Sequence, residues 1–389
     1  MTSVGIVLFP MDNESLGGIR NIIYHFVRGF EQIGVETEVY LTKHKVVKNK
    51  ISNKWIKLIR KEPVIISWNN PLDLKTLDVH DFLLTFHIGP HGTRKNPPKP
   101  GWENIFINTE PEKYPVICDP YWKKYYPHGV RVRKYISGLI VQHEAALRSI
   151  ISFPALKALI YLPYDSRLFE DIKWENKERI LVSFTHWKKW KNHKYLLQTL
   201  SKYGEDIKQL FDKILLYSDG IERRKMSSPH KNIREKFGYG DIWFEAQPYF
   251  EYKGYAPEDE KIEVLRRALF SIDLSWSESW NGNMTYTCFE AYTYGAILIG
   301  SSEHYIFDRE AYIDCGYPRS IENIYRALLK TKEIDEERWR YMIKRGREFI
   351  KNKHDAKEIA RQVLYFMEHK DTDGSFKIAH ERSLFSIKK

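Results

Sequence analysis

The sequence predicts an α/β fold made of two doubly wound, Rossmann-like domains. Short apolar runs of strand length alternate with helical segments along most of the 389 residues. The strands Val4–Phe9 and Ile180–Phe184 open the two halves, and a loop and a helical segment follow each of them. This order is typical of parallel sheets with crossover helices, and a chain of this length suggests two domains.

A Gly-Gly turn follows the first strand. Gly17 and Gly18 precede a helix whose apolar residues recur at helical spacing until Gly34. Glycine lacks a Cβ atom, so phosphates or a sugar can approach this backbone; an ordinary turn is the alternative. The first half has these further strand candidates: Val35–Leu41, Val64–Trp68, Asp81–Phe86, Asn104–Glu110 with its loop, and Gly138–Val141.

The charged run Glu170–Arg179 is the expected linker between the domains. It separates an N-terminal domain, residues 1–170, from a C-terminal domain, residues 171–369. We expect the final helices to cross back to the N-terminal domain and the tail, residues 370–389, to pack on that domain. The second half has a helix candidate at Glu258–Phe270 and strand candidates at Ile180–Phe184, Lys213–Tyr217, Asp241–Ala246 and Leu269–Leu274.

A strand, loop, helix and second strand occupy residues 269–300. The loop carries Glu278, and the helix begins near Thr285. Its N-terminus, at Tyr286 and Thr287, offers N–H groups and a positive dipole end to an anion such as diphosphate. Glu290 lies one turn further on the face of Tyr286, where it can accept hydrogen bonds from sugar hydroxyls. An ordinary helix with the same sequence pattern is the alternative.

Two other loops carry candidate ligand-binding residues. His186, Lys188 and Lys191 follow the strand that opens the second half. His87 follows Asp81–Phe86, and the carboxyl end of a strand is a common place for a ligand in an open α/β sheet. A core histidine is the alternative for His87. A metal site is not expected, because His87 and His91 have no evident third ligand.

These motifs resemble those of the retaining nucleotide-sugar glycosyltransferases of family 4, which have the GT-B fold. That family has a Ser-x-x-Glu after a strand and then Glu-Ala-x-x-x-Gly before the next strand. Ser275–Glu278 and Glu290–Gly295 fit this pattern, with Asn281–Met284 as an insertion between them. The family's Arg and Lys-Gly, which hold the donor diphosphate, correspond to His186 and Lys191. His186 lacks the permanent charge of Arg, and Lys188 or Lys189 is expected to replace it.

The resemblance implies transfer of a sugar, with retention, from a UDP-glucose-like donor across a cleft between the domains. The nucleotide sugar is then a co-substrate, and no metal cofactor is expected. The residues implied in catalysis are Lys191, His87 and Glu290. Those implied in donor binding are Gly17, Gly18, His186, Lys188, Lys191, Glu278, Tyr286, Thr287 and Glu290.

Short sequence motifs indicate different acceptors. The Gly-Gly-Ile-Arg turn and the Glu110-Pro loop resemble bacterial polysaccharide rhamnosyltransferases, which favours a surface or capsular glycan. The Trp-Lys before Lys191 and the Tyr-Thr-x-x-Glu at Tyr286 resemble bacteriophage DNA α-glucosyltransferases. A hydroxymethylated base in duplex DNA is therefore the alternative acceptor. A non-catalytic nucleic-acid-binding protein on the same fold is a further alternative.

The net charge of +11 suits a polyanionic partner, namely nucleic acid, an anionic membrane surface or a charged glycan. The basic stretch Lys43–Lys61 is a candidate surface that faces the acceptor or a membrane, or else a solvated helix or loop. The sequence shows no signal segment and no membrane span. Its three cysteines form no disulfide or metal pattern, so a cytoplasmic protein with reduced thiols is expected.

Overall fold

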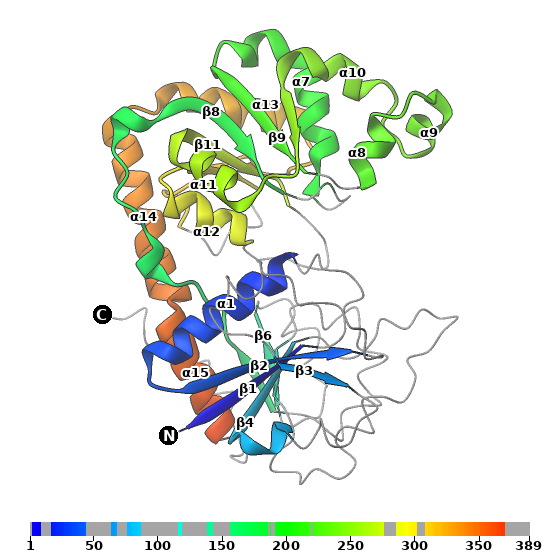
Figure 1. The fold of residues 1–389 in the computed structure, drawn as a ribbon. Helices are drawn as coiled ribbons and strands as arrows, with labels where there is room; N and C mark the ends of the chain where they lie inside the picture. Colours follow the sequence, from blue (N-terminus) through cyan, green and yellow to red (C-terminus); the bar gives the residue numbers. More distant parts are fainter. Residues whose placement is uncertain are drawn as a thin grey trace. The chain divides into compact units, whose positions relative to one another are not determined.

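The computed structural model forms two compact units (Figure 1). Unit 1 contains Met1–Asp165 and Asn352–Lys389, and unit 2 contains Ser166–Lys351. The chain therefore passes between the units twice, whereas the sequence placed the boundaries after residues 170 and 369. The structure describes residues 2–8, 17–43, 64–67, 76–86, 116–118, 138–142, 156–185, 187, 191–218, 221–275, 285–301 and 308–369.

Unit 1 contains a seven-stranded sheet in the order β3-β2-β1-β4-β5-β6-β7, with every neighbouring pair parallel. Ile6 of β1 pairs with Val39 of β2 on one side and with Leu84 of β4 on the other. The strand order thus reverses between β1 and β4, as in a doubly wound fold. The strands are β1 (Ser3–Leu8), β2 (Glu36–Lys43), β3 (Val64–Ser67), β4 (Phe82–Phe86), β5 (Val116–Cys118), β6 (Gly138–Val141) and β7 (Leu156–Leu159).

Helix α1 (Gly17–Gln32) packs against α15 (Ala356–Glu368), the last described helix of the chain. A Cβ atom at Gly29 would lie 2.1 Å from the carbonyl oxygen of Ala356, so only glycine allows this approach. Asp355 caps α15, because its carboxylate accepts hydrogen bonds from the backbone N–H groups of Lys357 and Glu358 at 3.1 and 3.3 Å. The domain boundary after residue 369 left α15 in the C-terminal domain. The expected return of the final helices to the N-terminal domain agrees with this close packing, which makes α15 part of unit 1.

Both passages of the chain out of unit 1 begin in one buried hydrogen-bonded cluster. The Tyr164 N–H donates to the carbonyl of His354 at 2.6 Å, and the His354 ring donates through Nδ1 to the carbonyl of Leu162 at 2.8 Å. His25 of α1 accepts the Asp165 N–H at 3.0 Å. Burial lowers the pKa of His25 to about 3 and that of His354 to about 4, so both rings are neutral at pH 7.

Unit 2 contains a six-stranded sheet in the order β10-β9-β8-β11-β12-β13, again with every neighbouring pair parallel. The order reverses between β8 and β11, which places a topological switch point there. The strands are β8 (Glu178–Ser183), β9 (Lys213–Tyr217), β10 (Glu251–Gly254), β11 (Ala268–Asp273), β12 (Ile297–Gly300) and β13 (Ile313–Asp314).

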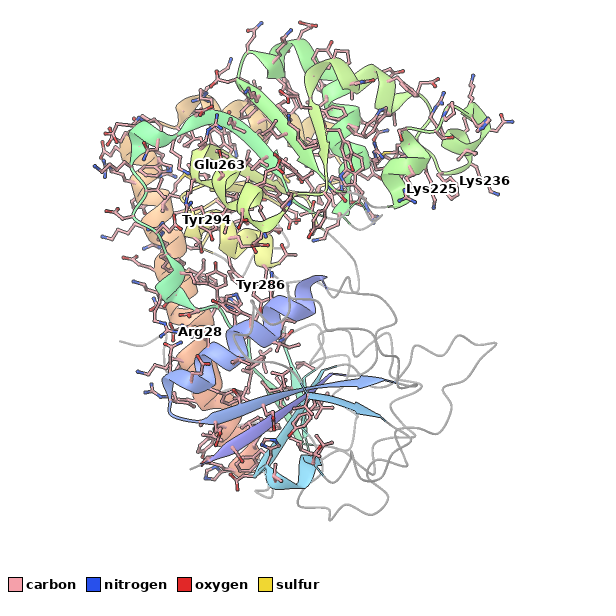
Figure 2. The ribbon with its side chains drawn as sticks, in the orientation of Figure 1. Arg28, Lys225, Lys236, Glu263, Tyr286 and Tyr294 are labelled. Atoms are coloured by element: carbon pink, nitrogen blue, oxygen red, sulfur yellow. The ribbon has the colours of Figure 1, made fainter. Side chains whose placement is uncertain are left out.

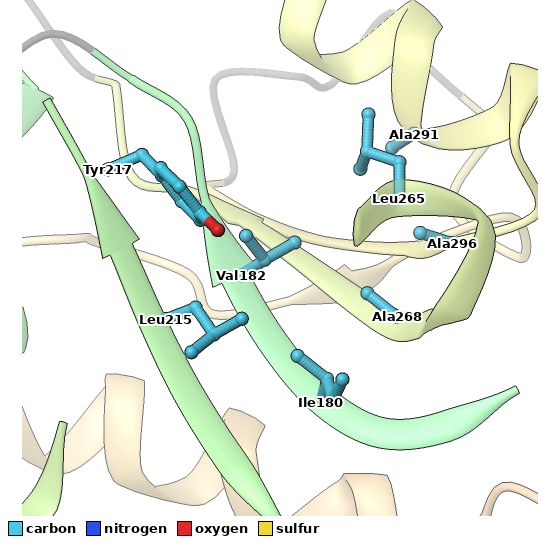
Figure 3. Packing of buried hydrophobic residues seen from close by; sticks show 8 residues of the cluster. All are labelled: Ile180, Val182, Leu215, Tyr217, Leu265, Ala268, Ala291 and Ala296. Atoms are coloured by element: carbon cyan, nitrogen blue, oxygen red, sulfur yellow. The ribbon is translucent and has the colours of Figure 1, made fainter. Parts of the chain in front are cut away.

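Helices cover both faces of the unit 2 sheet (Figure 1). Helices α7 (His193–Lys208) and α13 (Ile321–Leu329) pack together on one face, and α11 (Glu258–Arg267) and α12 (Tyr286–Thr293) cover the other. Figure 3 shows the core beneath α11, where Ile180 and Val182 of β8 lie near Leu265. The other helices are α8 (Ile221–Met226), α9 (Lys231–Lys236), α10 (Ile242–Ala246) and α14 (Glu336–His354).

The expected strand Asp241–Ala246 is wrong, because these residues form helix α10. Trp243 and Ala246 are buried while Phe244 is 45% exposed, which is the spacing of one helical face rather than the alternation of a strand. The third strand of this sheet is β10, further along the chain. The helix expected at Glu258–Phe270 ends earlier, at Arg267, because Ala268 begins β11.

Four short strands, β5, β7, β10 and β13, were not expected from the sequence. The expected strand and loop at Asn104–Glu110 lie outside the described residues, and so do the tail, residues 370–389, and most of Lys43–Lys61. Among the helices that the structure describes, none is both long and apolar enough to cross a bilayer.

Candidate functional site

A polar network lies at the switch point of the unit 2 sheet. β8 ends at Ser183 and β11 ends at Asp273, and these parallel strands are neighbours. The segment after β8 leads through Lys191 into α7, and the segment after β11 leads into α12. The carboxyl edge of an open parallel sheet at a switch point is where such folds bind ligands.

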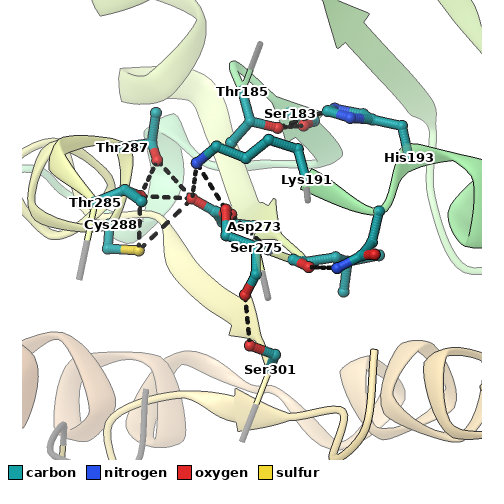
Figure 4. A network of polar contacts seen from close by, with 12 residues as sticks. Ser183, Thr185, Lys191, His193, Asp273, Ser275, Thr285, Thr287, Cys288 and Ser301 are labelled. Atoms are coloured by element: carbon teal, nitrogen blue, oxygen red, sulfur yellow. Dashed lines mark hydrogen bonds and ion pairs between the residues drawn. The ribbon is translucent and has the colours of Figure 1, made fainter. Parts of the chain in front are cut away.

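Asp273 is the centre of this network (Figure 4). Its side chain is only 1% exposed. One carboxylate oxygen accepts the Ser275 N–H at 2.9 Å and also the Ser275 hydroxyl. The other accepts the hydroxyls of Thr285 at 2.5 Å and Thr287 at 2.8 Å. These donors compensate the loss of water around a buried carboxylate and fix its orientation.

The ammonium group of Lys191 lies against the same carboxylate. Its Nζ donates to Ser275 Oγ at 2.7 Å and is 3.8 Å from Asp273 Oδ2. The Lys191 side chain is 13% exposed, so the ion pair is screened less by solvent than a surface pair would be. A cation is therefore held in one place at the carboxyl edge of the sheet.

Asn192 holds the start of α7 in place. It is the only non-glycine residue with positive φ among those described, at φ 56° and ψ 20°. Its amide donates to the carbonyl of Leu274 at 2.7 Å, which ties the Lys191 segment to the end of β11. Asparagine tolerates this left-handed conformation best after glycine. Lys191-Asn192 therefore has the backbone expected where the resembled family has Lys-Gly.

Trp187 anchors the same segment from the other side. Its ring is buried and stacks on His193, the first residue of α7, with centroids 4.6 Å apart and planes 12° apart. The ring centroid also lies 5.5 Å from that of Trp243 in α10, and the backbone N–H of Trp187 donates to Ser218 Oγ at 3.1 Å. The segment that carries Lys191 is thus packed at both ends.

The start of α12 adds dipolar groups to this edge. Thr285 is the N-cap residue, but its side chain makes no cap hydrogen bond and donates to Asp273 instead. Thr287, in the first turn, contacts the same carboxylate. The positive end of the helix dipole therefore lies beside the Lys191 cation, which is an arrangement suited to an anion.

Glu290 forms an ion pair within unit 2. Its Oε2 lies 2.6 Å from the Nζ of Lys261 in α11, and the two side chains are 12% and 15% exposed. Lys261 also lies 3.8 Å from Glu258. Glu290 is one turn into α12, as the sequence indicated, and Lys261 holds its carboxylate.

The Tyr286 ring belongs to the core of unit 2. It is 7% exposed and packs edge to face on Phe289, with centroids 5.6 Å apart. Figure 2 shows Tyr286 at the start of α12. Its backbone lies at the helix start, where an anion can bind, while its ring is used in packing.

The structure brings Lys191, Thr287 and the start of α12 together around Asp273. Gly17 and Gly18 begin α1, after β1 of unit 1. The other predicted site residues, His87, His186, Lys188 and Glu278, lie outside the described residues.

Asp273 and Lys261 were not predicted from the sequence. Asp273 had a detectable signal, because it is the only charged residue in the fully buried strand β11. An acidic residue in such a strand must have partners, and a search for them would have led to Lys191. Lys261 had no such signal, since it lies in a helix rich in charged residues.

The described residues contain no group of three or more His, Cys, Asp or Glu side chains that could hold a metal ion. A cavity of about 240 Å³ lies between α11 and the strands β9 and β10, and its lining does not include the Asp273 network. Its three cations, Lys213, Lys253 and Arg267, are matched by Glu251, Glu260 and Glu263. This cavity offers a diphosphate no net positive charge.

No protein-family model matches the sequence, and no curated protein matches it. Several solved structures are similar in fold to this chain. An α-glucosyltransferase in complex with UDP and a 13-mer DNA containing an HMU base has a TM-score of 0.68 and 13% identity, over 94% of this chain and 99% of that chain. HepE from Anabaena, in complex with UDP and glucose, has a TM-score of 0.65 and 11% identity, over 94% and 99%.

AviGT4, a glycosyltransferase involved in avilamycin A biosynthesis, has a TM-score of 0.56 and 12% identity, over 95% of this chain and 97% of that chain. At these identities the similarity shows the fold alone. The chain has the GT-B fold of glycosyltransferases, with Rossmann-like domains, as the sequence predicted.

Proposed function

We propose that this protein is a glycosyltransferase that moves a sugar from a UDP-linked donor to an acceptor hydroxyl, with retention at the anomeric carbon. The observation that carries the proposal is the Lys191 cation beside the start of α12, at the switch point of the unit 2 sheet. The similarity to solved glycosyltransferases that hold UDP supports the choice of nucleotide.

The site suits a reaction in which a diphosphate leaves. As the bond from the anomeric carbon to the phosphate oxygen breaks, negative charge grows on that oxygen. Lys191 and the helix start of α12 stabilise this charge, and they do so from fixed positions. Removal of one such donor costs about 2–4 kcal/mol in other enzymes.

Glu290 is proposed to bind hydroxyls of the donor. Its carboxylate is partly buried and fixed by Lys261, yet it keeps acceptor capacity for hydroxyl hydrogens. The acceptor hydroxyl attacks from the face that the diphosphate leaves, so its proton passes to the departing phosphate oxygen. This route needs no protein nucleophile. His87, near the transferred sugar in the resembled family, is proposed to contact that sugar.

The first candidate acceptor is a surface or capsular glycan. The Gly-Gly-Ile-Arg turn at Gly17 and the Glu110-Pro loop support it through their resemblance to polysaccharide enzymes. Duplex DNA with a hydroxymethylated base is the second candidate. Two observations favour DNA: the net charge of +11 and the similarity to an α-glucosyltransferase that holds DNA with an HMU base.

A donor screen tests the proposal. Purified protein is incubated with nucleotide sugars, with glycans or with duplex DNA containing hydroxymethylated bases, and the released nucleotide is measured. We expect release from UDP-glucose that increases when the correct acceptor is present. If no nucleotide sugar is consumed and calorimetry detects no binding of UDP, the proposed activity is wrong and a non-catalytic role on this fold replaces it.

A salt series separates the acceptors. DNA binding through Lys43–Lys61 should weaken with salt, and a Lys48/Lys50/Lys54 triple Ala variant should flatten the slope by about one unit for each lost phosphate contact. An uncharged glycan should show little dependence, and anionic liposomes in parallel detect a membrane contact. A Lys202/Lys231/Lys344 triple Ala variant, with exposed lysines of unit 2, is the matched control.

A further inference from the structure

The carboxylate of Asp273 and a donor diphosphate would compete for the same cation, the Lys191 ammonium. Both groups are anionic, and both would use the Lys191 ammonium, which is now 3.8 Å from Asp273 Oδ2. Asp273 cannot turn away easily, because Ser275, Thr285 and Thr287 all donate hydrogen bonds to it.

We propose that Asp273 is a positioning residue for Lys191 and that it weakens the site's hold on the free nucleoside diphosphate. The inference rests on the proposed function and assigns a role to a residue for which the resemblance gave none. It has two parts, placement of the cation and charge balance around the diphosphate.

The first part concerns where the ammonium is held. A lysine side chain is a flexible stem with a point charge, so a mobile ammonium still finds a diphosphate in the ground state. The transition state is more demanding, because displacement of a catalytic group by about 1 Å can cost about 100-fold in rate. Asp273 and Ser275 fix the ammonium before the donor arrives.

The second part concerns the charge of the product. In a diphosphate attached to a sugar, the terminal phosphate carries a single negative charge. In free UDP the terminal phosphate gains a second negative charge near neutral pH, because phosphate has a second pKa of about 6. The buried Asp273 carboxylate repels this added charge more strongly than a solvated group would. Repulsion favours product release, which limits turnover in many enzymes.

A purely structural role would have a different signature. Asp273 joins the end of β11 to the start of α12, so its loss could simply loosen this edge. Loosening would lower the melting temperature and weaken the binding of every ligand. Positioning with charge balance instead predicts tighter binding of UDP together with slower turnover.

The experiment uses Asp273→Asn in the full chain. UDP affinity is measured by calorimetry, turnover by nucleotide release, and folding by thermal unfolding. We expect UDP to bind about five- to tenfold more tightly and the turnover number to fall at least tenfold. UDP affinity that is within twofold of wild type, or weaker, in a folded variant overturns the inference. Asp308→Asn, which removes the carboxylate of the Asp308–Arg345 pair of unit 2, is the matched control and should leave UDP affinity unchanged.

A second measurement needs only the wild-type protein. UDP and its β-methyl ester, which has the lower charge of a sugar-linked diphosphate, are compared at pH 7.5. We expect similar affinities for the two. UDP binding that is tenfold or more tighter than ester binding overturns the inference even if Asp273→Asn does not fold. If wild type binds neither compound, the proposed function fails first, and this outcome is distinguishable from both others.

Discussion

The two units share a doubly wound strand order, but the buried cluster around His25 and His354 in unit 1 and the network around Asp273 in unit 2 are held in different ways. In unit 1, His25 and His354 bond to main-chain groups of Leu162–Asp165. In unit 2, Lys191 and Asp273 bond mainly through side chains of Ser275, Thr285 and Thr287. Main-chain partners fix the path of the chain. Side-chain partners at the sheet edge fix the Lys191 ammonium where we propose that the donor binds.

This difference supports the proposal that the functional edge lies in unit 2, a choice that the fold alone does not make. Both sheets have a switch point, and a fold alone does not assign a function. The cluster of unit 1 should therefore control stability, and the network of unit 2 should control the donor and turnover.

The largest expected effect is acid destabilisation through unit 1. Burial lowers the pKa of His25 to about 3 and that of His354 to about 4, against about 6.5 in an unfolded chain. Between pH 6.5 and 4 the unfolded chain therefore binds more protons, and the free energy of unfolding falls as the pH falls. Each histidine should contribute about 3 kcal/mol to the loss by pH 4.

His25→Asn isolates one of these contributions. Asparagine can accept the Asp165 N–H through its Oδ1 but does not take up a proton. Urea unfolding at pH 7 and pH 4.5 should show a smaller loss of stability in this variant than in wild type. His230→Asn, at an exposed histidine of unit 2, is the control. An unchanged pH dependence in His25→Asn would contradict the structural role of the cluster.

The next effect concerns Lys191 in unit 2. Lys191→Ala removes the cation that stabilises the leaving diphosphate, so the turnover number should fall by roughly 30- to 1000-fold, or about 2–4 kcal/mol. Nucleotide release at saturating donor measures this, with thermal unfolding as a check on folding. Lys202→Ala, at a half-exposed lysine paired with Glu322, is the control. Turnover within twofold of wild type would move the role to Lys188 or Lys189.

The smallest effect concerns Glu290. Glu290→Gln keeps the size of the side chain but replaces the charged acceptor, so affinity for the nucleotide sugar should fall about tenfold, or about 1.4 kcal/mol. Calorimetry measures the affinity. Glu258→Gln is the matched control, because Glu258 is the other carboxylate near Lys261. Equal losses in the two variants would show that the Lys261 ion pair, rather than a donor contact, is what matters.

Apolar runs were enough to predict most of the sheet strands. Val4–Phe9, Val35–Leu41 and Lys213–Tyr217 coincide closely with β1, β2 and β9. Such runs are typical of the strands of a parallel sheet, because these strands are buried on both faces. Asp241–Ala246 was misread, because its bulky apolar residues suit a strand and only their burial at every third position reveals α10.

The site was predictable to the extent that it is local in sequence. Lys191 and the helix start near Thr285 lie in the segments that come next after predicted strands, so their place at the carboxyl edge of the sheet was expected. The pairing of Lys191 with Asp273, and that of Glu290 with Lys261, joins separate elements. Such pairs depend on the register of neighbouring strands and helices, which spacing along the chain does not report.

The double passage between the units has a consequence for synthesis. Unit 2 is one continuous segment, Ser166–Lys351, whereas unit 1 needs Asn352–Lys389 to be complete. As the chain emerges from the ribosome, the surface of α1 around Gly29 has no α15 to cover it until Ala356–Glu368 has emerged. The usual order, in which the N-terminal domain folds first, is therefore reversed: unit 2 can finish folding while unit 1 still waits for its final helix.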